Sequence, residues 1–208
     1  MRMESIIAAI ACIVVGAGQG SGLPASNEDE ADAVAGVRPY EMEWAGRDGP
    51  KHPQLADFED LDGWRVRCIE GAEAKLLRST QEFCFGEYAA KVVYTGKTAL
   101  STFIIEPAEP MVIPGAFTGV NLWVRGNNWS FAQPAAPMRA RVAVRVRDAK
   151  GEVYRIELDG VTFDYWCVMH RTLVNPGTGE FNPCVQPEDG ADAVIDYPAD
   201  FLGIECVG

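Results

Sequence analysis

The sequence predicts an all-β fold, a two-sheet antiparallel β-sandwich. Residues 119–125, 139–147 and 153–158 alternate apolar and polar side chains, which is typical of strands with one buried face. The last two segments are joined by the turn Asp148-Ala149-Lys150-Gly151, and its glycine reaches a positive φ at no steric cost. The 21 Gly and 13 Pro suit many short strands joined by turns. We therefore expect the three segments to form an antiparallel meander.

The alternation also predicts which side chains of these strands face the core, because neighbouring side chains on a strand point to opposite sides of a sheet. Further strands are expected at 64–69, 74–79, 88–94, 102–105 and 201–207, and a strand pair or one bent strand at 160–173. The side chains expected to face inward are Ala90, Val92, Tyr94, Val120, Leu122, Val124, Ala140, Val142, Val144, Val146, Tyr154, Ile156 and Leu158.

The chain divides into four parts by composition. Residues 1–20 are predicted to be a signal peptide, because the apolar run at 5–17 follows Arg2 and precedes small residues; the alternative is a short buried helix. Cleavage is expected between residues 17 and 25. Residues 21–37 are predicted to be a flexible acidic tether, 38–54 a lead-in arm, and 55–208 the globular sandwich. A secreted protein, extracellular or periplasmic, is therefore expected.

Charge and hydropathy narrow the classes of partner. The formal net charge is −12 and the pI is about 4.6, which argues against nucleic acid, since binding to phosphates relies on clustered Lys and Arg. No segment reaches the roughly 18 apolar residues that a membrane-spanning helix needs. We therefore expect neither nucleic acid nor a membrane span among the partners of this chain.

The order of its segments resembles the galactose-binding-like jelly rolls, the fold of many carbohydrate-binding modules. The segments that carry the resemblance span residues 38–208: RPYEMEWAGR, DFEDLDGW, GEYAAKVVYTG, VIPGAFTGVNLWVRGNNW, VRDAKGEVYRIEL, FDYWCVMHRTL and FLGIECVG. The resemblance implies a jelly roll whose last strand lies beyond Gly208. It also implies a noncatalytic module that binds a polysaccharide or other glycan, with a downstream domain of the same polypeptide, such as a glycoside hydrolase, as its neighbour.

The same resemblance implies a binding site for a structural Ca²⁺. In that family an acidic residue just before the first strand binds calcium together with backbone carbonyls of a later loop, which here corresponds to the region of Glu87. The candidates are Asp57, Glu59 and Asp60, since calcium takes several carboxylate and carbonyl oxygens at once. From the residues alone, acidic side chains before a strand are also compatible with a purely solvated role.

A sugar site needs aromatic planes for stacking and planar polar groups for the hydroxyls. The outward-facing residues of the three central strands have that composition, and we expect the strands to be neighbours in one sheet. The alternative is that Trp123 is covered by the arm and that the charged residues only solvate an outer face. Trp129 is a second candidate, as an exposed anchor or a packed side chain. The predicted platform comprises Asn121, Trp123, Arg125, Arg141, Arg145, Arg155 and Glu157.

Cysteines are the last chemical group to place. Leaving out Cys12, five of the six cysteines remain. We expect Cys68 to pair with Cys84, and Cys167 with Cys184 or Cys206, because a secreted chain meets an oxidising compartment. One cysteine is then left over, for a partner beyond residue 208 or for intermolecular pairing.

Catalysis has little support in the sequence. A glycosidase needs two carboxylates across the scissile bond, and nothing marks such a pair among Glu157, Asp164 and Glu180. We therefore expect no intrinsic enzyme activity. The competing hypothesis to glycan binding is a structural or interaction module that packs against a neighbouring domain and binds no sugar.

Overall fold

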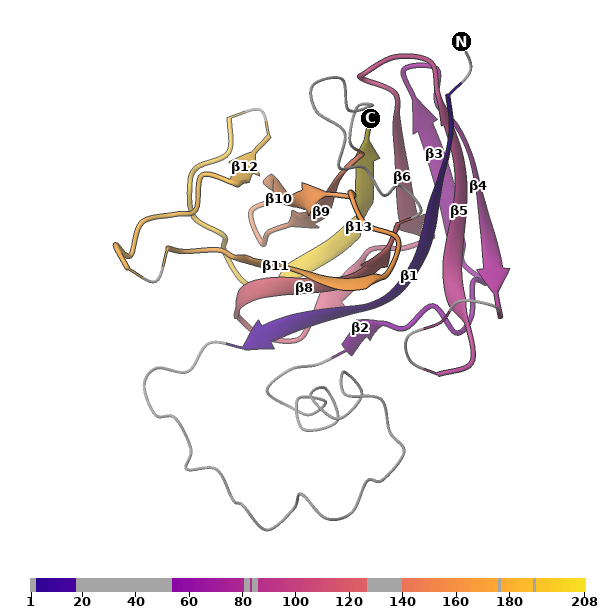
Figure 1. Cartoon of the computed structure of the whole chain (residues 1–208). Helices are drawn as coiled ribbons and strands as arrows, with labels where there is room; N and C mark the ends of the chain where they lie inside the picture. Colours follow the sequence, from indigo (N-terminus) through magenta and orange to yellow (C-terminus); the bar gives the residue numbers. More distant parts are fainter. Residues whose placement is uncertain are drawn as a thin grey trace.

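The structure is a computed structural model that describes the backbone of residues 3–17 and the whole of residues 54–80, 83, 86–126, 140–175, 177–188 and 190–208. The described residues form an all-β fold with antiparallel pairing between the strands, and no helix occurs among them (Figure 1). The prediction of an antiparallel β-sandwich is therefore confirmed. Most of the predicted tether and arm, together with Trp129 and Cys84, lie outside the described residues.

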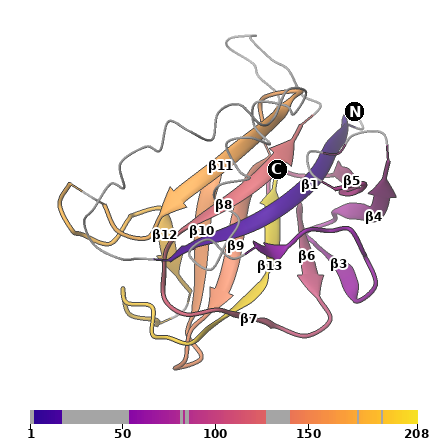
Figure 2. The same ribbon diagram turned by 90° about the horizontal axis from the view of Figure 1, so that it is seen from below.

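One sheet has six strands and follows the order β11-β8-β1-β5-β4, with β2 also paired to β1. Figure 2 shows β11, β8 and β1 lying side by side in this sheet. The bounds of its strands are Met3–Ala17 for β1, Gln54–Ala56 for β2, Glu73–Ser79 for β4, Ala89–Gly96 for β5, Phe117–Arg125 for β8 and Trp166–Thr172 for β11.

The other sheet has seven strands and follows the order β12-β10-β9-β13-β6-β3, with β7 paired to β13. Its last strand in sequence, β13, lies in the middle of the sheet between β9 and β6. The bounds are Trp64–Ile69 for β3, Thr102–Pro107 for β6, Met111–Ile113 for β7, Arg141–Arg147 for β9, Val153–Gly160 for β10, Val185–Pro187 for β12 and Ala199–Val207 for β13.

The hydrophobic core lies between the two sheets and contains the inward faces that the alternation predicts. All thirteen of the side chains predicted to face inward are buried and belong to one core cluster. The largest fully buried side chains include Tyr154, Phe103 and Phe201. Burial of these faces from both sheets is what holds the sandwich together.

The hairpin between β9 and β10 is confirmed, whereas the predicted three-stranded meander is wrong. Gly151 has φ +88° and its N–H donates to the Asp148 carbonyl at 3.1 Å, so the turn is closed as expected. However, β8 pairs with β11 and β1 in the six-stranded sheet, and β9 pairs with β10 and β13 in the other. Alternation identified the three strands but did not determine their partners.

The segment predicted to be a signal peptide, or alternatively a buried helix, is the strand β1 in this structure. It pairs antiparallel with β5 through residues 3–10 and with β8 through residues 10–17. In Figure 1 the indigo strand lies between β5 and β8, in the interior of the sheet. The helical alternative is therefore wrong. Cleavage of the segment stays a prediction.

Among the described residues, the structure contains no helix of the length and hydrophobicity that crossing a membrane requires.

Candidate functional site: a cleft beside the first strand of the seven-stranded sheet

The predicted sugar platform is divided between the two sheets. Asn121, Trp123 and Arg125 belong to β8 in the six-stranded sheet, whereas Arg141 and Arg145 belong to β9 in the seven-stranded sheet. Both strands turn their valine faces into the shared core, so their polar faces point outward on opposite sides of the sandwich. The expectation that these strands are neighbours in one sheet is wrong, and no single platform exists.

On the outer face of β8, the aromatic plane that a sugar would need is buried. Trp123 is only 6% exposed, so its ring is not available for stacking. The nearby Asn121 carboxamide oxygen accepts a hydrogen bond from Nδ1 of His170 on the adjacent strand β11. The pKa of His170 is lowered by burial and by the neighbouring Arg171. The arm proposed to cover Trp123 lies outside the described residues.

On the outer face of the seven-stranded sheet, the arginines bind carboxylates of the same face. Arg145 donates from Nη2 to both oxygens of Glu188 at 2.8 Å. Arg155 donates from Nε to Glu205 at 2.6 Å and from Nη1 to Glu157 at 2.9 Å. Cross-strand pairs of this kind stabilise an exposed sheet.

Arginines at both ends of β9 also lie beside carboxylates. Arg141 lies 3.7 Å from Glu157, and Arg147 donates to Asp200 at 2.7 Å. The guanidinium groups of this face are therefore engaged with carboxylates across four neighbouring strands or their flanking loops. This result favours the alternative in which the charged residues solvate and tie together an outer face.

The carboxylates predicted to bind calcium accept hydrogen bonds from backbone N–H groups. Asp57 Oδ1 accepts from the N–H of Glu59 at 3.1 Å, and Asp60 Oδ1 accepts from the N–H of Asp62 at 2.8 Å. Glu59 Oε1 accepts from the N–H of Glu87 at 3.0 Å. The structure thus brings Glu59 to the loop expected from the resemblance, but through N–H donors.

That contact explains a glycine in the loop. Gly86 has φ +64°, and a Cβ built there would lie 1.9 Å from Oε1 of Glu59. The positive φ favours glycine at this position, and the missing Cβ leaves room for the Glu59 carboxylate. Glu59 fixes the entry of β5 to the loop that precedes β3. Calcium binding at Asp57, Glu59 and Asp60 stays a prediction.

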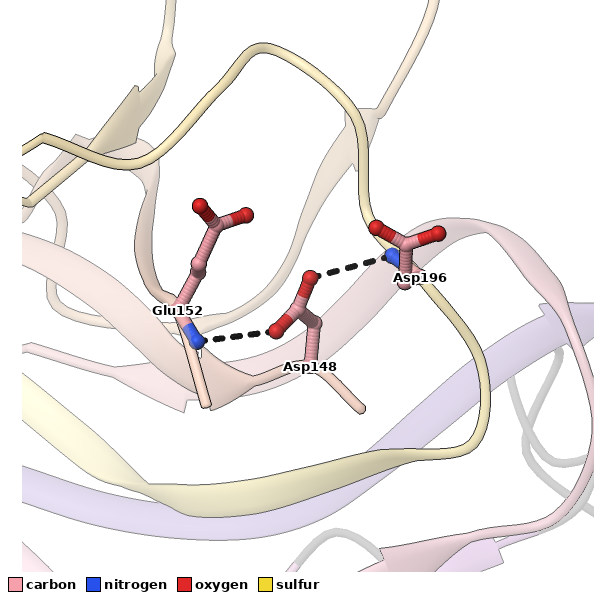
Figure 3. A group of neighbouring side chains, drawn as sticks. All are labelled: Asp148, Glu152 and Asp196. Carbon is pink, nitrogen blue, oxygen red and sulfur yellow. Dashed lines mark hydrogen bonds between the residues drawn. The ribbon is translucent and has the colours of Figure 1, made fainter. Parts of the chain in front are cut away.

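A different acidic group comes together at the β9–β10 turn, and the sequence reasoning missed it. Asp148, Glu152 and Asp196 place one carboxylate oxygen each within 4.8 Å of one another, and Figure 3 shows the Asp148 carboxylate between the other two. Asp148 is 4% exposed and accepts hydrogen bonds from the backbone N–H groups of Glu152 at 2.8 Å and Asp196 at 3.2 Å. The Lys150 ammonium lies 2.7 Å from Oδ2 of Asp196.

These three carboxylates and Lys150 connect the β9–β10 turn to the 192–196 segment, and we call this group the turn staple. The oxygens of Asp148 hold the hairpin to the 192–196 segment, and Lys150 supplies the positive charge beside Asp196. An aspartate at the first position of a tight turn is the sequence signal that identifies such a residue, because its side chain bonds to the backbone two residues on. The N–H of Lys150 makes that bond to Asp148 at 2.9 Å.

The predicted disulfides are not formed by the cysteines that the structure describes. Cys68, Cys167, Cys184 and Cys206 all carry free thiols. Cys167 lies on β11 in the six-stranded sheet, whereas Cys206 lies on β13 in the other sheet and Cys184 just before β12. Pairing of Cys167 with either partner is therefore wrong here. Burial raises the pKa of the Cys206 thiol, which keeps it protonated in the core.

A cleft of about 550 Å³ lies where β3 begins and β6 ends, and we call it the end cleft. Its volume falls in the range of small-ligand sites, roughly 300–1,000 Å³. Pairing of Trp64 with Pro107 brings its two walls together, and the N–H of Ala108 donates to the carbonyl of Gly63. The lining residues are Gln54, Leu55, Ala56, Asp57, Phe58, Asp62, Gly63, Trp64, Pro107, Ala108, Glu109 and Met111.

The end cleft combines an aromatic side chain with carboxylates. Trp64 is partly buried, with its ring centroid 4.6 Å from that of Phe58 and 6.2 Å from that of Phe201. Asp57, Asp62 and Glu109 are exposed at its walls. A fixed aromatic ring beside carboxylates can stack on the C–H face of a sugar and accept hydrogen bonds from its hydroxyls.

The first wall of the cleft is anchored by a strained residue. Phe58 has φ +60° and is 1% exposed, so a bulky side chain holds a left-handed backbone conformation by being packed in the core. Such strain costs about 1–3 kcal/mol and occurs preferentially at functional sites. It fixes the loop before β3, which carries both Asp57 and Asp62 along one wall of the cleft.

No protein-family model, no curated protein and no solved structure matches this chain. The fold and the geometry of the end cleft therefore carry the functional argument.

Proposed function

We propose that this chain is a noncatalytic glycan-binding module, and that the end cleft is where the glycan binds. The observation that supports this proposal is the fixed Trp64 ring lining a cleft together with the carboxylates of Asp57, Asp62 and Glu109. The aromatic ring supplies a stacking surface, and the carboxylates accept hydroxyl hydrogen bonds. This places the site in loops at the strand ends, away from the outer faces of either sheet.

Affinity gel electrophoresis on a panel of neutral polysaccharides tests the proposal. Wild-type protein should be retarded by at least one of them, and Trp64→Ala should remove most of that retardation. Trp166→Ala is the matched control, because Trp166 is also partly buried but lies on β11 in the other sheet. Melting curves of both variants exclude unfolding as the cause.

Two results would count against the proposal. Equal retardation of wild type and a folded Trp64→Ala variant would place the glycan elsewhere. Retention on no polysaccharide would favour the alternative, a structural or interaction module that packs against a neighbouring domain. An assay for released reducing sugar tests the noncatalytic part, and we expect no release.

The wider context is part of the same proposal. We propose a galactose-binding-like module of a larger secreted, carbohydrate-active protein, with a downstream domain such as a glycoside hydrolase and with a structural Ca²⁺ near Glu59. The support is the ordered set of segments at 38–208 and the position of Glu59 beside the loop at Glu87. A melting temperature that falls on chelation supports the calcium; an unchanged one rejects it.

Secretion depends on the fate of residues 3–17. The apolar run there supports an export signal, yet the same residues form β1 between β5 and β8. Cleavage between residues 17 and 25 would remove that strand, so the two roles exclude each other in a mature chain. Determining the N-terminal residue of exported protein distinguishes them: an N-terminus at residues 18–25 means that the strand is lost.

A further inference from the structure

We infer that the end cleft selects glycans that carry free amino groups, such as glucosamine oligomers, over neutral or acidic glycans. This inference rests on the proposed function and names the chemical class of its ligand. The observation behind it is the charge of the lining: of the twelve lining residues within the described part of the chain, three carry carboxylates and none is Lys, Arg or His.

The carboxylates come from both walls of the cleft. Asp57 and Asp62 belong to the loop before β3, and Glu109 belongs to the connection between β6 and β7. One Asp57 oxygen accepts the N–H of Glu59, and the second oxygen adds to the negative charge at the cleft. A ligand lying against Trp64 therefore has carboxylates on two sides.

Positive charges near the cleft in sequence are directed elsewhere. Arg65 follows Trp64 directly, so its side chain points to the opposite face of the strand. Its Nε donates to Glu106 at 3.0 Å, and Nε of Arg67 lies 3.3 Å from the same carboxylate. Neither arginine lines the cleft. On the outer face of the seven-stranded sheet the situation differs, because Glu157, Glu188, Asp200 and Glu205 each have an arginine partner there.

The whole molecule reinforces this local field. A net charge of −12 raises the local concentration of cations and disfavours uronic or sulfated glycans. One exposed ion pair changes an affinity only about 1.5- to 5-fold. Carboxylates on two walls should therefore give a preference of roughly tenfold for an amine over its uncharged counterpart.

The experiment is a calorimetric titration with two ligands that share one carbohydrate skeleton, a glucosamine oligomer and its N-acetylated form. It is run at low salt and at mildly acid pH, where the free amine carries a proton. Wild type should bind the amine form about tenfold more tightly. Asp62→Asn/Glu109→Gln should lose most of that preference, since only Asp57 remains. It should keep its affinity for the N-acetylated oligomer, because the amide oxygens still accept hydrogen bonds from hydroxyl groups.

The matched control is Asp164→Asn/Glu180→Gln, which changes the net charge equally at exposed positions that do not line the cleft. It should keep the preference, which separates the cleft carboxylates from the overall charge. Equal binding of both oligomers by wild type would overturn the inference and leave the proposed function standing. A preference that is as large in the cleft double variant as in wild type would overturn it too. If wild type binds neither oligomer, and no polysaccharide retards it, the proposed function fails as well.

Discussion

The outer face of the seven-stranded sheet and the end cleft are both rich in charged residues, but their charges are arranged differently. On the sheet face, Arg145 and Arg155 bind Glu188, Glu205 and Glu157 within the same surface. In the cleft, carboxylates lie on both walls beside Trp64, and none of the lining residues that the structure describes is basic. The arginines and carboxylates of the sheet face use their hydrogen bonds on each other. The carboxylates beside Trp64 can still accept hydrogen bonds from a ligand. Changes on the sheet face should therefore alter stability, and changes in the cleft should alter binding.

The largest effect on stability should come from deleting residues 3–17. The deletion removes the ladder partners of both β5 and β8, and leaves backbone N–H and C=O groups unpaired inside a sheet. Because domains are stable by only about 5–15 kcal/mol, we expect the cooperative thermal transition to disappear. Calorimetry of the deleted and full-length chains measures this. A sharp transition at the wild-type temperature would contradict a structural role for β1 and would agree with a cleaved leader.

Asp148→Ala should have the next largest effect. The substitution leaves the N–H groups of Lys150, Glu152 and Asp196 without their acceptor, which should cost about 2–4 kcal/mol. Denaturant unfolding gives the value. Asp148→Asn is the comparison and should lose less, because its amide oxygen still accepts from Lys150 and Glu152 and only the N–H of Asp196 loses its acceptor. Retardation by a polysaccharide should not change. If Asp148→Ala unfolds like wild type, the turn staple does not hold the hairpin.

Arg145→Ala should have a moderate effect. Its side chain is 17% exposed and binds Glu188, with Glu205 at 3.8 Å, so its loss should cost about 1–2 kcal/mol. Arg145→Met keeps the aliphatic part of the side chain and isolates the charge. Both variants should bind glycan as wild type does. Loss of glycan binding in a folded Arg145 variant would indicate that the glycan binds on the outer face of the seven-stranded sheet.

The smallest effect should be the pH dependence that His170 contributes. Burial and Arg171 lower its pKa in the folded protein, so the unfolded chain binds this proton more readily. Stability should therefore fall as the pH drops below about 6.5, the ordinary value for histidine. Unfolding curves of wild type and His170→Gln over this range measure the difference. An identical pH dependence in both would mean that His170 contributes nothing.

Local patterns predicted the longer strands of residues 64–207 and one hairpin, but they missed β1, β7 and β12, and long-range pairing determined the partners. The alternation at 119–125 and 139–147 identified two strands with buried valines, but a strand with one apolar face fits either sheet of a sandwich. The turn at 148–151 could be predicted because its geometry depends on Asp148 and Gly151 alone. The same limit explains why Arg141 and Arg145 appeared to share a surface with Trp123.

The end cleft could not be predicted because it is made by residues distant in sequence. Trp64 and Glu109 lie on one cleft only because β3 pairs with β6, which places Trp64 opposite Pro107. Both regions did carry a local signal, acidic residues next to Gly or Pro in the segments 57–64 and 106–110. That signal suggested only a calcium site at Asp57, because nothing local indicates that a second acidic loop lies opposite.

Chemical-shift mapping on the isotope-labelled chain tests the central claim most directly. On titration with an oligosaccharide of a retained polysaccharide, or with the glucosamine oligomer, the backbone amides of residues 57–64 and 108–111 should shift together. The amides of β9 and β10 should stay in place. Shifts concentrated on β9 and β10, or no shifts at all, would contradict glycan binding at the end cleft.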